Sequence, residues 1–374
     1  PLRLVGSEMC IRDSIYWGTS GNSGLYLDEI YQILKKGGYN QKIYVNYYYP
    51  FGYGEKIFFK RGDVAMSRYK GITRKLFQLQ EILCGYVRIL FASMKDKPTV
   101  INYSHVGQSY FFIVCFLRLL KKVSGAKLMI TCHDVNPHSE GKGEMTNRYK
   151  IFHLADYLLV HTEKSIFELN ENFGINKSVV VKHPFPIMDL SKLTKDGPNP
   201  YCDVDFLFIG HLRKDKGIEF LLDSWPEFHK LHPNAKLRVC GRKLHDVYFN
   251  QELLEKCNVE FNLRYISDDD YYHYVKAARY VILPYLQGTN SGIISTVLSL
   301  GTDVITSDLP MFLQNPLVPK ENTFHTANAE SLVNVLQLKY NTLTNFASGR
   351  LDDYKIRFEE SVLCVYKRIY ATDD

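Results

Sequence analysis

The sequence lacks features that mark several large classes of protein, and each absence narrows what the chain can be. Its longest strongly apolar stretch, residues 110–120, contains Arg118 and is well short of the roughly 20 residues that a membrane-spanning helix needs. None of its eight cysteines forms a C-x-x-C pair, which argues against a zinc site or a disulfide framework and favours reduced cytosolic thiols. No secretory signal is evident, so we expect a cytoplasmic location.

The net charge is also modest, at +6 from 46 basic and 40 acidic residues. That balance suits an anionic ligand or an anionic membrane surface. It argues against a nucleic-acid partner, because no dense basic stripe with interleaved aromatic residues accompanies it. The composition, with 45% hydrophobic and 23% charged residues, is typical of a globular protein. The length of 374 residues is typical of two domains.

Short apolar runs alternate with amphipathic helical segments along most of the chain. We expect strands at 14–17, 42–46, 99–102, 127–132, 157–161, 178–182, 204–209, 235–240, 259–261, 280–284 and 303–307. The helices expected in the second half lie at 217–229, 245–256, 268–276, 291–300 and 352–370. Buried parallel strands joined by helices predict an α/β protein with two doubly wound sheets.

The expected domain boundaries follow from the breaks in this pattern. A polar stretch with two prolines, residues 191–203, indicates a linker between an N-terminal domain at 15–190 and a C-terminal domain at 204–350. We expect the terminal helix within 351–374 to cross back to the first domain. Residues 1–14 have no periodicity and fit no targeting class, so we expect them to be a non-native leader.

A glycine-rich loop, G-T-S-G-N-S-G, follows the first expected strand and opens a helix. The residues of interest are Gly18, Ser20, Gly21 and Asn22. Glycine lets the backbone approach a ligand, and the amides of a helix N-terminus attract a phosphate or sugar oxygen. The loop would also fit an NAD-dependent sugar-nucleotide epimerase, but the second strand ends without the acid that holds the ribose. A tight turn without a ligand is the remaining alternative.

Two loops in the second half carry further polar chemistry. After strand 204–209 come Gly210, Arg213 and Lys216, just before a helix, where side-chain charge and the helix dipole favour a diphosphate. A solvated basic loop is the alternative. After strand 280–284, backbone amides and polar side chains could cradle a pyrophosphate, and we expect Ser291 to cap the next helix. That loop contains Gly288, Thr289, Asn290, Ser291, Gly292 and Ile293.

The order of these motifs resembles glycosyltransferase family 4, the group 1 transferases of GT-B fold. Residues 206–310 contain F-x-G-x-x-R-x-x-K-G, then L-P-Y, S-G-I and G-x-x-V-I-x-S-D. T-C-H-D at 131–134 and K-H-P at 182–184 are similar to landmarks of the family's first domain. The resemblance implies two Rossmann-like domains facing each other across a cleft. It also implies transfer of a sugar from a nucleotide-sugar donor to a glycan or lipid-linked acceptor.

The resemblance implies roles for individual residues. Arg213 and Lys216 would hold the donor diphosphate and stabilise the departing nucleoside diphosphate, without a metal or another cofactor. Backbone amides of residues 288–293 would add to that stabilisation. His133 would face the reacting sugar, and the loop 18–24 would line the same cleft near the acceptor or the donor phosphates. Transfer in such enzymes usually retains the anomeric configuration.

One departure from the family pattern bears on nucleotide recognition. The family commonly carries two glutamates in an E-x(7)-E motif, the second of which holds the ribose hydroxyls. One alignment register places Thr289 and Val297 there, and the other places Gly288 and Thr296. Neither contains an acid, so the chain resembles the subset of the family without this pair. A non-catalytic sugar-nucleotide-binding homologue is therefore an alternative, with the NAD-dependent epimerase as a further one.

Residues 67–97 interleave basic and apolar residues at helical spacing. A basic amphipathic helix can rest on anionic lipid, which would suit a lipid-linked acceptor and a peripheral position at the inner face of the membrane. The alternative that we favour is a helix that covers the first sheet and has a basic outer face. We expect residues 111–120 to form a buried helix.

Overall fold

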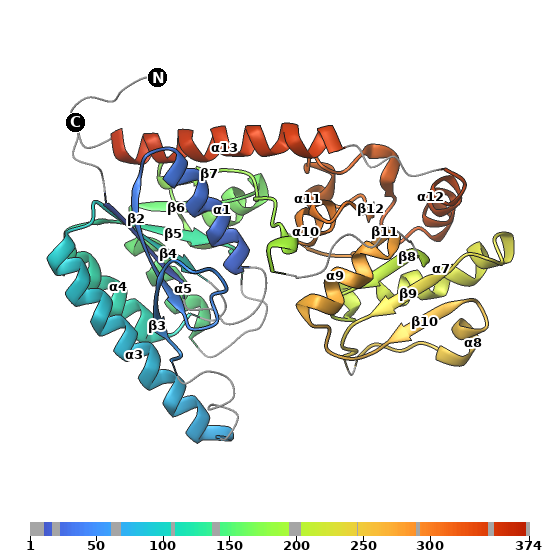
Figure 1. Cartoon of the computed structure of the whole chain (residues 1–374), viewed down its shortest axis with the longest axis horizontal. Coiled ribbons are helices and arrows are strands. Elements are labelled where there is room, and N and C mark those ends of the chain that lie inside the picture. Colours follow the sequence, from blue (N-terminus) through green and yellow to red (C-terminus); the bar gives the residue numbers. More distant parts are fainter. Residues whose placement is uncertain are drawn as a thin grey trace. The chain divides into compact units, whose positions relative to one another are not determined.

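The structure is a computed structural model that describes residues 11–16, 23–60, 69–105, 109–136, 143–193, 203–244, 246–288, 292–342 and 348–371. The chain forms two compact units (Figure 1). Unit 1 comprises Pro1–Pro186 and Phe358–Asp374, and unit 2 comprises Ile187–Arg357. In the described residues, no helix combines the length and the apolar character needed to cross a membrane.

Unit 1 is built on a parallel sheet. The strands described are β1 (Ile11–Tyr16), β2 (Asn40–Asn46), β3 (Glu55–Phe58), β4 (Val100–His105), β5 (Lys127–Cys132), β6 (Tyr157–Val160) and β7 (Val180–Lys182). Their order is β3-β2-β1-β4-β5-β6-β7, and neighbouring strands pair in parallel. The direction of strand addition reverses between β1 and β4, as in a doubly wound sheet.

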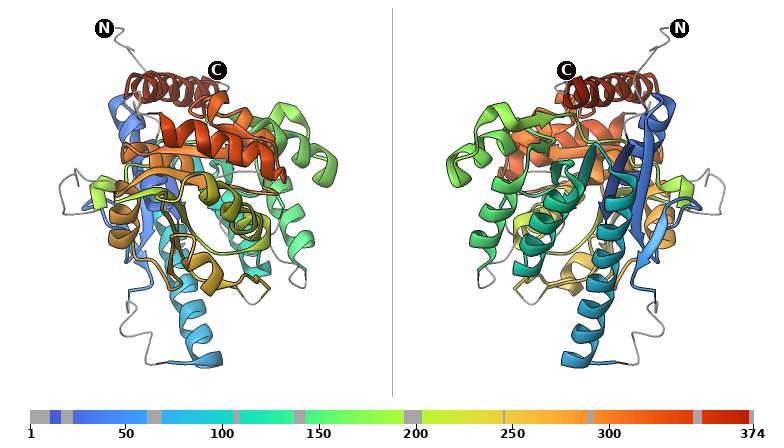
Figure 2. Two further views of the ribbon diagram at one scale, coloured as in Figure 1. Left: turned by 90° about the vertical axis from the view of Figure 1, so that its right-hand side faces the viewer. Right: turned by 90° about the vertical axis from the view of Figure 1, so that its left-hand side faces the viewer.

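Helices cover the sheet of unit 1. They are α1 (Ser23–Lys36), α3 (Gly71–Asp96), α4 (Phe111–Ser124), α5 (Glu144–Leu154), α6 (Glu163–Phe173) and the end of α13 (Ser348–Ala371). Figure 2 shows α3, α4 and α5 side by side, and α3 packs closely on the sheet where Gly85 meets the Phe58 ring. The right-handed crossover rule places α1 on the opposite face. Near α1, α13 stacks its Tyr370 on Tyr39 at 5.1 Å between ring centroids.

Unit 2 repeats this plan. The strands described are β8 (Val204–Ile209), β9 (Leu237–Cys240), β10 (Val259–Asn262), β11 (Ala278–Leu283), β12 (Asp303–Ser307) and β13 (Thr323–Phe324), in the order β10-β9-β8-β11-β12-β13. The helices are α7 (Ile218–Leu231), α8 (Gln251–Glu255), α9 (Asp268–Lys276), α10 (Ile293–Ser299), α11 (Pro310–Leu313) and α12 (Ala329–Asn341). Short 3-10 turns occur at η2 (Leu190–Leu193) and η3 (Lys214–Lys216). All strand pairs are parallel.

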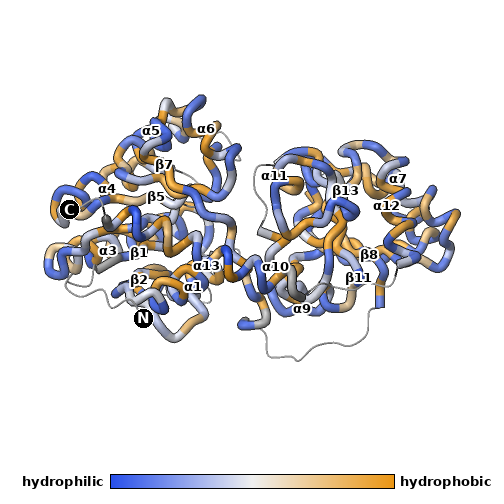
Figure 3. The backbone as a smooth tube through the Cα atoms, turned by 90° about the horizontal axis from the view of Figure 1, so that it is seen from above, coloured by the Kyte–Doolittle hydropathy of each residue, from blue (hydrophilic) through white to orange (hydrophobic). Residues whose placement is uncertain are grey.

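Each unit has its own hydrophobic core, and the hydrophobic residues concentrate along the strands (Figure 3). In unit 2 the fully buried Trp225 contacts Phe206 and Phe228, with ring centroids 5.9 and 5.0 Å away. Its indole N–H donates to the Cys257 carbonyl oxygen at 2.8 Å, so the buried ring leaves no unpaired donor.

The prediction of two α/β halves with parallel sheets is confirmed. Strand β1 begins at Ile11 rather than at residue 14, so part of the expected leader pairs with β2. The expected helix 245–256 is wrong in extent, because α8 begins only after Asn250, whose side chain accepts from the Leu253 N–H and caps it. Of the expected linker, residues 194–202 lie outside the described residues.

Candidate functional site

Glycines shape the loop that follows β8. Gly210 has φ +136° and Gly241, after the neighbouring β9, has φ +140°. A Cβ on Gly241 would lie 1.7 Å from the Gly210 carbonyl oxygen, so the two strand ends approach closely only because no side chain intervenes. The predicted site residue Gly210 therefore lies at the C-terminal end of β8, where the backbone needs glycine.

Arg213 and Lys216 lie on the turn that leads from β8 to α7. Arg213 has an extended backbone at the start of η3, and Lys216 is the last residue of that turn. Gly217 follows with φ +66° and begins α7. A Cβ on Gly217 would lie 1.8 Å from the Pro284 carbonyl oxygen. Glycine at this position is what allows the basic turn to touch the loop after β11.

Several contacts hold the loop after β11 against the basic turn. The backbone N–H groups of Leu286 and Gln287 donate to the Asp215 carbonyl oxygen, at 2.9 and 3.3 Å. Lys216 Nζ lies 3.7 Å from the centroid of the Tyr285 ring, which is a cation–π contact. The structure thus brings together two of the loops that the sequence predicts as diphosphate-binding, although many residues separate them along the chain.

The position of these loops in the sheet favours a ligand. Strands β8 and β11 are neighbours, and the direction of strand addition reverses between them. In open α/β sheets, ligands bind beyond the carboxyl ends of the strands at such a point. The basic turn and the loop after β11 therefore flank the place where this fold type usually binds a ligand.

Arg213 is held by an ion pair inside its own turn. Its Nη2 donates to Asp215 Oδ2 at 2.6 Å, and both side chains are about one-third exposed. An ion pair of this exposure contributes little stability, so a diphosphate can compete for the guanidinium. The Arg213 Nε is buried and makes no hydrogen bond with any described residue.

The second predicted diphosphate loop is described only in part. Gly288 lies against Met311, where an added Cβ would be 2.7 Å from the Met311 Cε. Gly292 occupies the N-cap position of α10, and Ile293 is the first residue of that helix. Outside the described residues lie Thr289, Asn290 and Ser291, including the expected cap residue.

His133 lies in unit 1 at the C-terminal end of β5. Its Nε2 is 3.1 Å from the Ser104 Oγ, at the end of the neighbouring β4, and its ring meets the Tyr26 ring edge-on at 4.7 Å. Burial lowers the pKa of His133 to about 4, and the opposing effect of the nearby Asp134 does not cancel this shift. The imidazole is therefore neutral at neutral pH and can exchange hydrogen bonds without adding charge.

Two further histidines surround His133 at the same edge of the sheet. The His161 ring lies 5.7 Å from His133 and 5.1 Å from His183. Its Nδ1 is 3.2 Å from the His183 carbonyl oxygen, and burial lowers its pKa well below the ordinary value. At this edge of unit 1, the His133 and His161 rings are consequently neutral at neutral pH.

A buried ion pair that the sequence reasoning missed supports the loop after β5. Arg148 Nη2 donates to Glu144 Oε1 at 2.9 Å, and both side chains are nearly inaccessible to solvent. Arg148 Nη1 donates to the Asp134 carbonyl oxygen at 2.8 Å, and Glu144 accepts from the Ser109 N–H at 2.7 Å. An i,i+4 Glu–Arg pair is visible in the sequence, but its spacing is the same for an exposed surface pair.

Asp308 is the aspartate of the G-x-x-V-I-x-S-D motif, and its contacts indicate a role in holding the fold together. Burial opposes its ionisation, but hydrogen bonds from Thr326 and His325 outweigh burial and lower the pKa of Asp308 to about 2. The carboxylate thereby ties the end of β12 to the segment after β13.

Two further points concern the first glycine-rich loop and a possible metal site. Residues 17–22 lie outside the described residues, and they include Gly18, Ser20, Gly21 and Asn22 of the first glycine-rich loop. Within the described part of the chain, no group of three or more His, Cys, Asp or Glu side chains is arranged to hold a metal ion.

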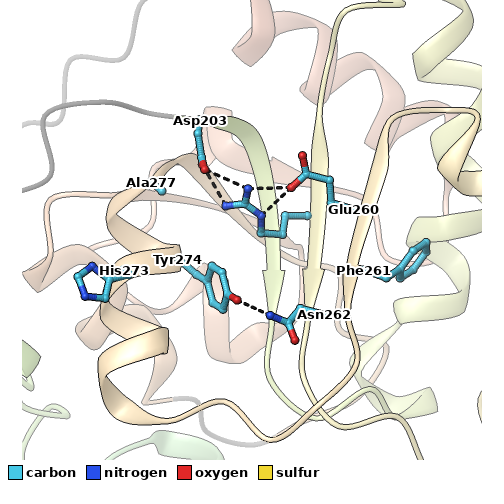
Figure 4. A pocket seen from close by; sticks show the side chains of 8 residues that line it. Asp203, Glu260, Phe261, Asn262, His273, Tyr274 and Ala277 are labelled. Atoms are coloured by element: carbon cyan, nitrogen blue, oxygen red, sulfur yellow. Dashed lines mark hydrogen bonds and ion pairs between the residues drawn. The ribbon is translucent and has the colours of Figure 1, made fainter.

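Unit 2 also contains a cavity of about 400 Å³ (Figure 4). It is lined by Asp203, Arg238, Glu260, Phe261, Asn262, His273, Tyr274 and Ala277, none of which we predicted as a site residue. Two carboxylates compensate the charge of Arg238: Asp203 accepts two hydrogen bonds at 3.0 Å, and Glu260 accepts two at 2.9 and 2.7 Å. The cavity is therefore less suited to bind an anion than the turn that carries Arg213 and Lys216.

Comparison with known proteins shows what this chain is similar to. Residues 203–337 match the family model described as glycosyl transferases group 1. An uncharacterized glycosyltransferase of Methanocaldococcus jannaschii is 25% identical over 300 residues, covering 75% of this chain and 71% of the relative.

Two solved structures share the fold over nearly the whole chain. Sucrose-phosphate synthase from Thermosynechococcus elongatus has a TM-score of 0.60 at 15% identity and covers 97% of this chain and 100% of its own. HepE from Anabaena, solved in complex with UDP-glucose, has a TM-score of 0.59 at 12% identity and covers 97% and 99%. The predicted GT-B fold is confirmed, and residues 203–337 resemble the group 1 glycosyltransferases, as the sequence motifs predict.

Proposed function

We propose that this protein is a glycosyltransferase that binds the diphosphate of a nucleotide-sugar donor at the carboxyl edge of the unit 2 sheet and transfers the sugar to a glycan or glycolipid acceptor. The observation that carries the proposal is the contact between two loops. Lys216 lies on the Tyr285 ring, and Arg213 is on the same turn, beside the switch point of the sheet. Cations fixed beside the carboxyl ends of parallel strands favour the binding of an anionic ligand.

The chemistry that these residues supply is stabilisation of the leaving group. Negative charge develops on the diphosphate as the bond to the sugar breaks, and cations fixed beside it lower the barrier most at that moment. Arg213 would exchange its ion pair with Asp215 for the phosphate oxygens, which accept in a bidentate fashion. Because two cations already neutralise the charge, we propose that transfer needs no metal and that chelation with EDTA leaves turnover unchanged.

The finer features of the reaction follow the family resemblance. We infer retention of the anomeric configuration, with the acceptor hydroxyl attacking on the face that the leaving group vacates. HepE is a protein solved with UDP-glucose, which supports a uridine diphosphate sugar as the first donor to test here. His133 would meet the sugar as a neutral imidazole, and the loop 18–24 would contact the acceptor or the donor phosphates. We propose a cytoplasmic location for this reaction.

The missing glutamate pair supports one competing function, a non-catalytic sugar-nucleotide-binding protein. In one alignment register the second glutamate position is Thr296, which is fully buried and donates its hydroxyl to the Gly292 carbonyl oxygen at 3.2 Å. In the other register it is Val297, which is also fully buried. Neither side chain can reach a ribose, so other groups must recognise the nucleoside.

The test measures release of nucleoside diphosphate from a panel of nucleotide sugars in the presence of glycan and lipid-linked acceptors. Lys216→Ala should lower turnover roughly 100-fold, because a charge-assisted contact to the leaving group is lost. Lys230→Ala, an exposed lysine near the end of α7, is the matched control and should leave turnover unchanged. Unchanged turnover in Lys216→Ala would refute the assignment, and binding without any release would favour the non-catalytic alternative.

A further inference from the structure

Helix α3 leaves a row of large hydrophobic side chains in solvent. It packs on the unit 1 sheet through a buried face that includes Ile82, Tyr86 and Ile89. Its exposed hydrophobic residues are Ile72, Leu76, Leu83, Val87, Phe91 and Met94. Their spacings of 3, 4 and 7 residues bring them into one row along the helix, and Phe91 is 69% exposed. The outer face of α3, which we expected to be basic, therefore also carries a row of apolar side chains.

The neighbouring helices extend this exposed surface. Helix α4 packs beside α3, and α5 packs beside α4 (Figure 2). Helix α4 exposes Phe111 and Leu119, and α5 exposes Met145 and Tyr149. Scattered hydrophobic residues are ordinary on a protein surface, but a row along one helix, with further exposed hydrophobic residues on the helix packed beside it, marks an interaction site. We call the exposed row of α3 with Phe111 and Leu119 of α4 the apolar face.

Cations border the apolar face, and exposed acids are absent from both helices that form it, each of which is fully described. The exposed cations are Arg74, Lys75, Arg88, Lys95, Arg118 and Lys122. Helix α4 contains no acid, and α3 contains two. Of these, Asp96 is ion-paired with Lys42, and Glu81 is partly buried. A partner for this surface must therefore be apolar at its centre and anionic around it.

We propose that the apolar face of α3 and α4 lies on the surface of a bilayer that contains anionic phospholipid. The hydrophobic side chains would enter the interfacial region, and Arg88 and Lys95 would reach the headgroup phosphates. The opposite face of α3 is packed on the sheet, so the helix lies along the bilayer. A second copy of the chain fits less well, because apposed faces would bring like charges together. This inference does not depend on the proposed sugar transfer.

The test is co-sedimentation of the whole protein with lipid vesicles at low ionic strength. We expect binding to vesicles in which about a third of the lipid is phosphatidylglycerol, and little binding to phosphatidylcholine alone. Replacing Leu83, Val87 and Phe91 together by serine should weaken binding at least tenfold. The charge reversal Arg88→Glu with Lys95→Glu should do the same.

Matched controls come from unit 2, where Tyr248→Ser removes a side chain that is 71% exposed and Lys230→Glu reverses an exposed charge. Both control variants should bind like the wild type. Equal binding to neutral and anionic vesicles, or undiminished binding of the serine variant, would overturn the proposal. So would a concentration-dependent dimer that the serine variant abolishes, if no vesicle binding accompanies it.

A second readout does not depend on the folding of a multiple variant. Phe91→Trp should show a blue-shifted emission and quenching by brominated lipid in anionic vesicles, whereas Tyr248→Trp should show neither. If the fluorescence at position 91 does not respond to vesicles, the proposal is wrong.

Discussion

The two units share a sheet plan but differ in the chemistry of the edge where their strands end. In both units a parallel sheet reverses its direction of strand addition beside the first strand, at β1 and β4 and at β8 and β11. The edge of unit 2 carries Arg213 and Lys216 beside a loop packed through backbone contacts. The edge of unit 1 carries His133 and His161, which burial keeps neutral.

This difference shows that one scaffold can carry two edges of different charge. The strands of both sheets are buried apolar runs that specify the scaffold, whereas the residues just after them set the charge of each edge. A cationic edge suits a diphosphate. A neutral imidazole, by contrast, can donate one hydrogen bond and accept another, which suits hydroxyl groups.

The largest expected effect concerns the close approach on which the cationic edge depends. Gly217→Ala would place a Cβ 1.8 Å from the Pro284 carbonyl oxygen at φ +66°, so we expect a loss of about 3 kcal/mol in the free energy of unfolding of unit 2. Urea unfolding followed by tryptophan fluorescence measures this loss. Trp17, the other tryptophan of the sequence, is replaced by phenylalanine so that the buried Trp225 is the reporter.

Gly301→Ala is the control for backbone conformation alone. Gly301 has φ +84°, but an added Cβ would meet no atom within 4 Å. We expect it to cost only about 1 kcal/mol. Equal losses for the two variants would show that the approach of Gly217 to Pro284 does not matter.

The second prediction tests the neutral edge of unit 1 through pH. The pKa of His133 is about 4 in the folded chain and near 6.5 when unfolded, so the unfolded state binds more protons between these values. Stability from this group is complete above pH 6.5 and is lost as the pH falls toward 4, by up to about 3 kcal/mol. We expect the free energy of unfolding, measured with urea at several pH values in this range, to change less steeply with pH in His133→Asn than in the wild type. The exposed His153→Asn serves as the control, and an unchanged slope in His133→Asn would show that His133 is not held neutral.

The smallest expected effect concerns the ion pair in the cationic turn. Asp215→Asn removes the carboxylate that competes for Arg213 but keeps the backbone carbonyl that accepts from Leu286 and Gln287. We expect the affinity for a nucleoside diphosphate to rise about threefold, since an exposed pair is worth under about 1 kcal/mol. Isothermal titration calorimetry measures it, and a loss of affinity would mean that Asp215 itself holds the ligand in place.

Much of the fold could be predicted from the sequence, because long buried strands carry a clear pattern. The bounds of β5, β8, α9 and β12 agree with those expected. The sequence reasoning missed β3 and β13, which are edge strands of four and two residues, and it also missed α12. The expected helix 245–256 was too long because its cap, Asn250, was not recognised.

The candidate site was only partly predictable, because contacts between distant segments decide it. The motif indicated Arg213 and Lys216, but the packing of Lys216 on Tyr285 depends on how β8 and β11 pair. In the same way, the sequence shows Glu144 and Arg148 at i,i+4 spacing but does not show that both are buried behind the loop after β5. The sequence indicated a basic outer face for α3 but not the apolar row on it, because residue types alone do not show which apolar side chains the sheet leaves uncovered.

The most direct test of the cationic edge compares a nucleoside diphosphate with its monophosphate by isothermal titration calorimetry. For the wild type and for Lys230→Ala, we predict that removing the terminal phosphate lowers affinity at least tenfold, because that phosphate would contact the fixed cations in the proposed site. For Lys216→Ala, the diphosphate and the monophosphate should bind almost equally. If Lys216→Ala still prefers the diphosphate as strongly as the wild type does, Lys216 does not bind the donor phosphates and the account of this edge is contradicted.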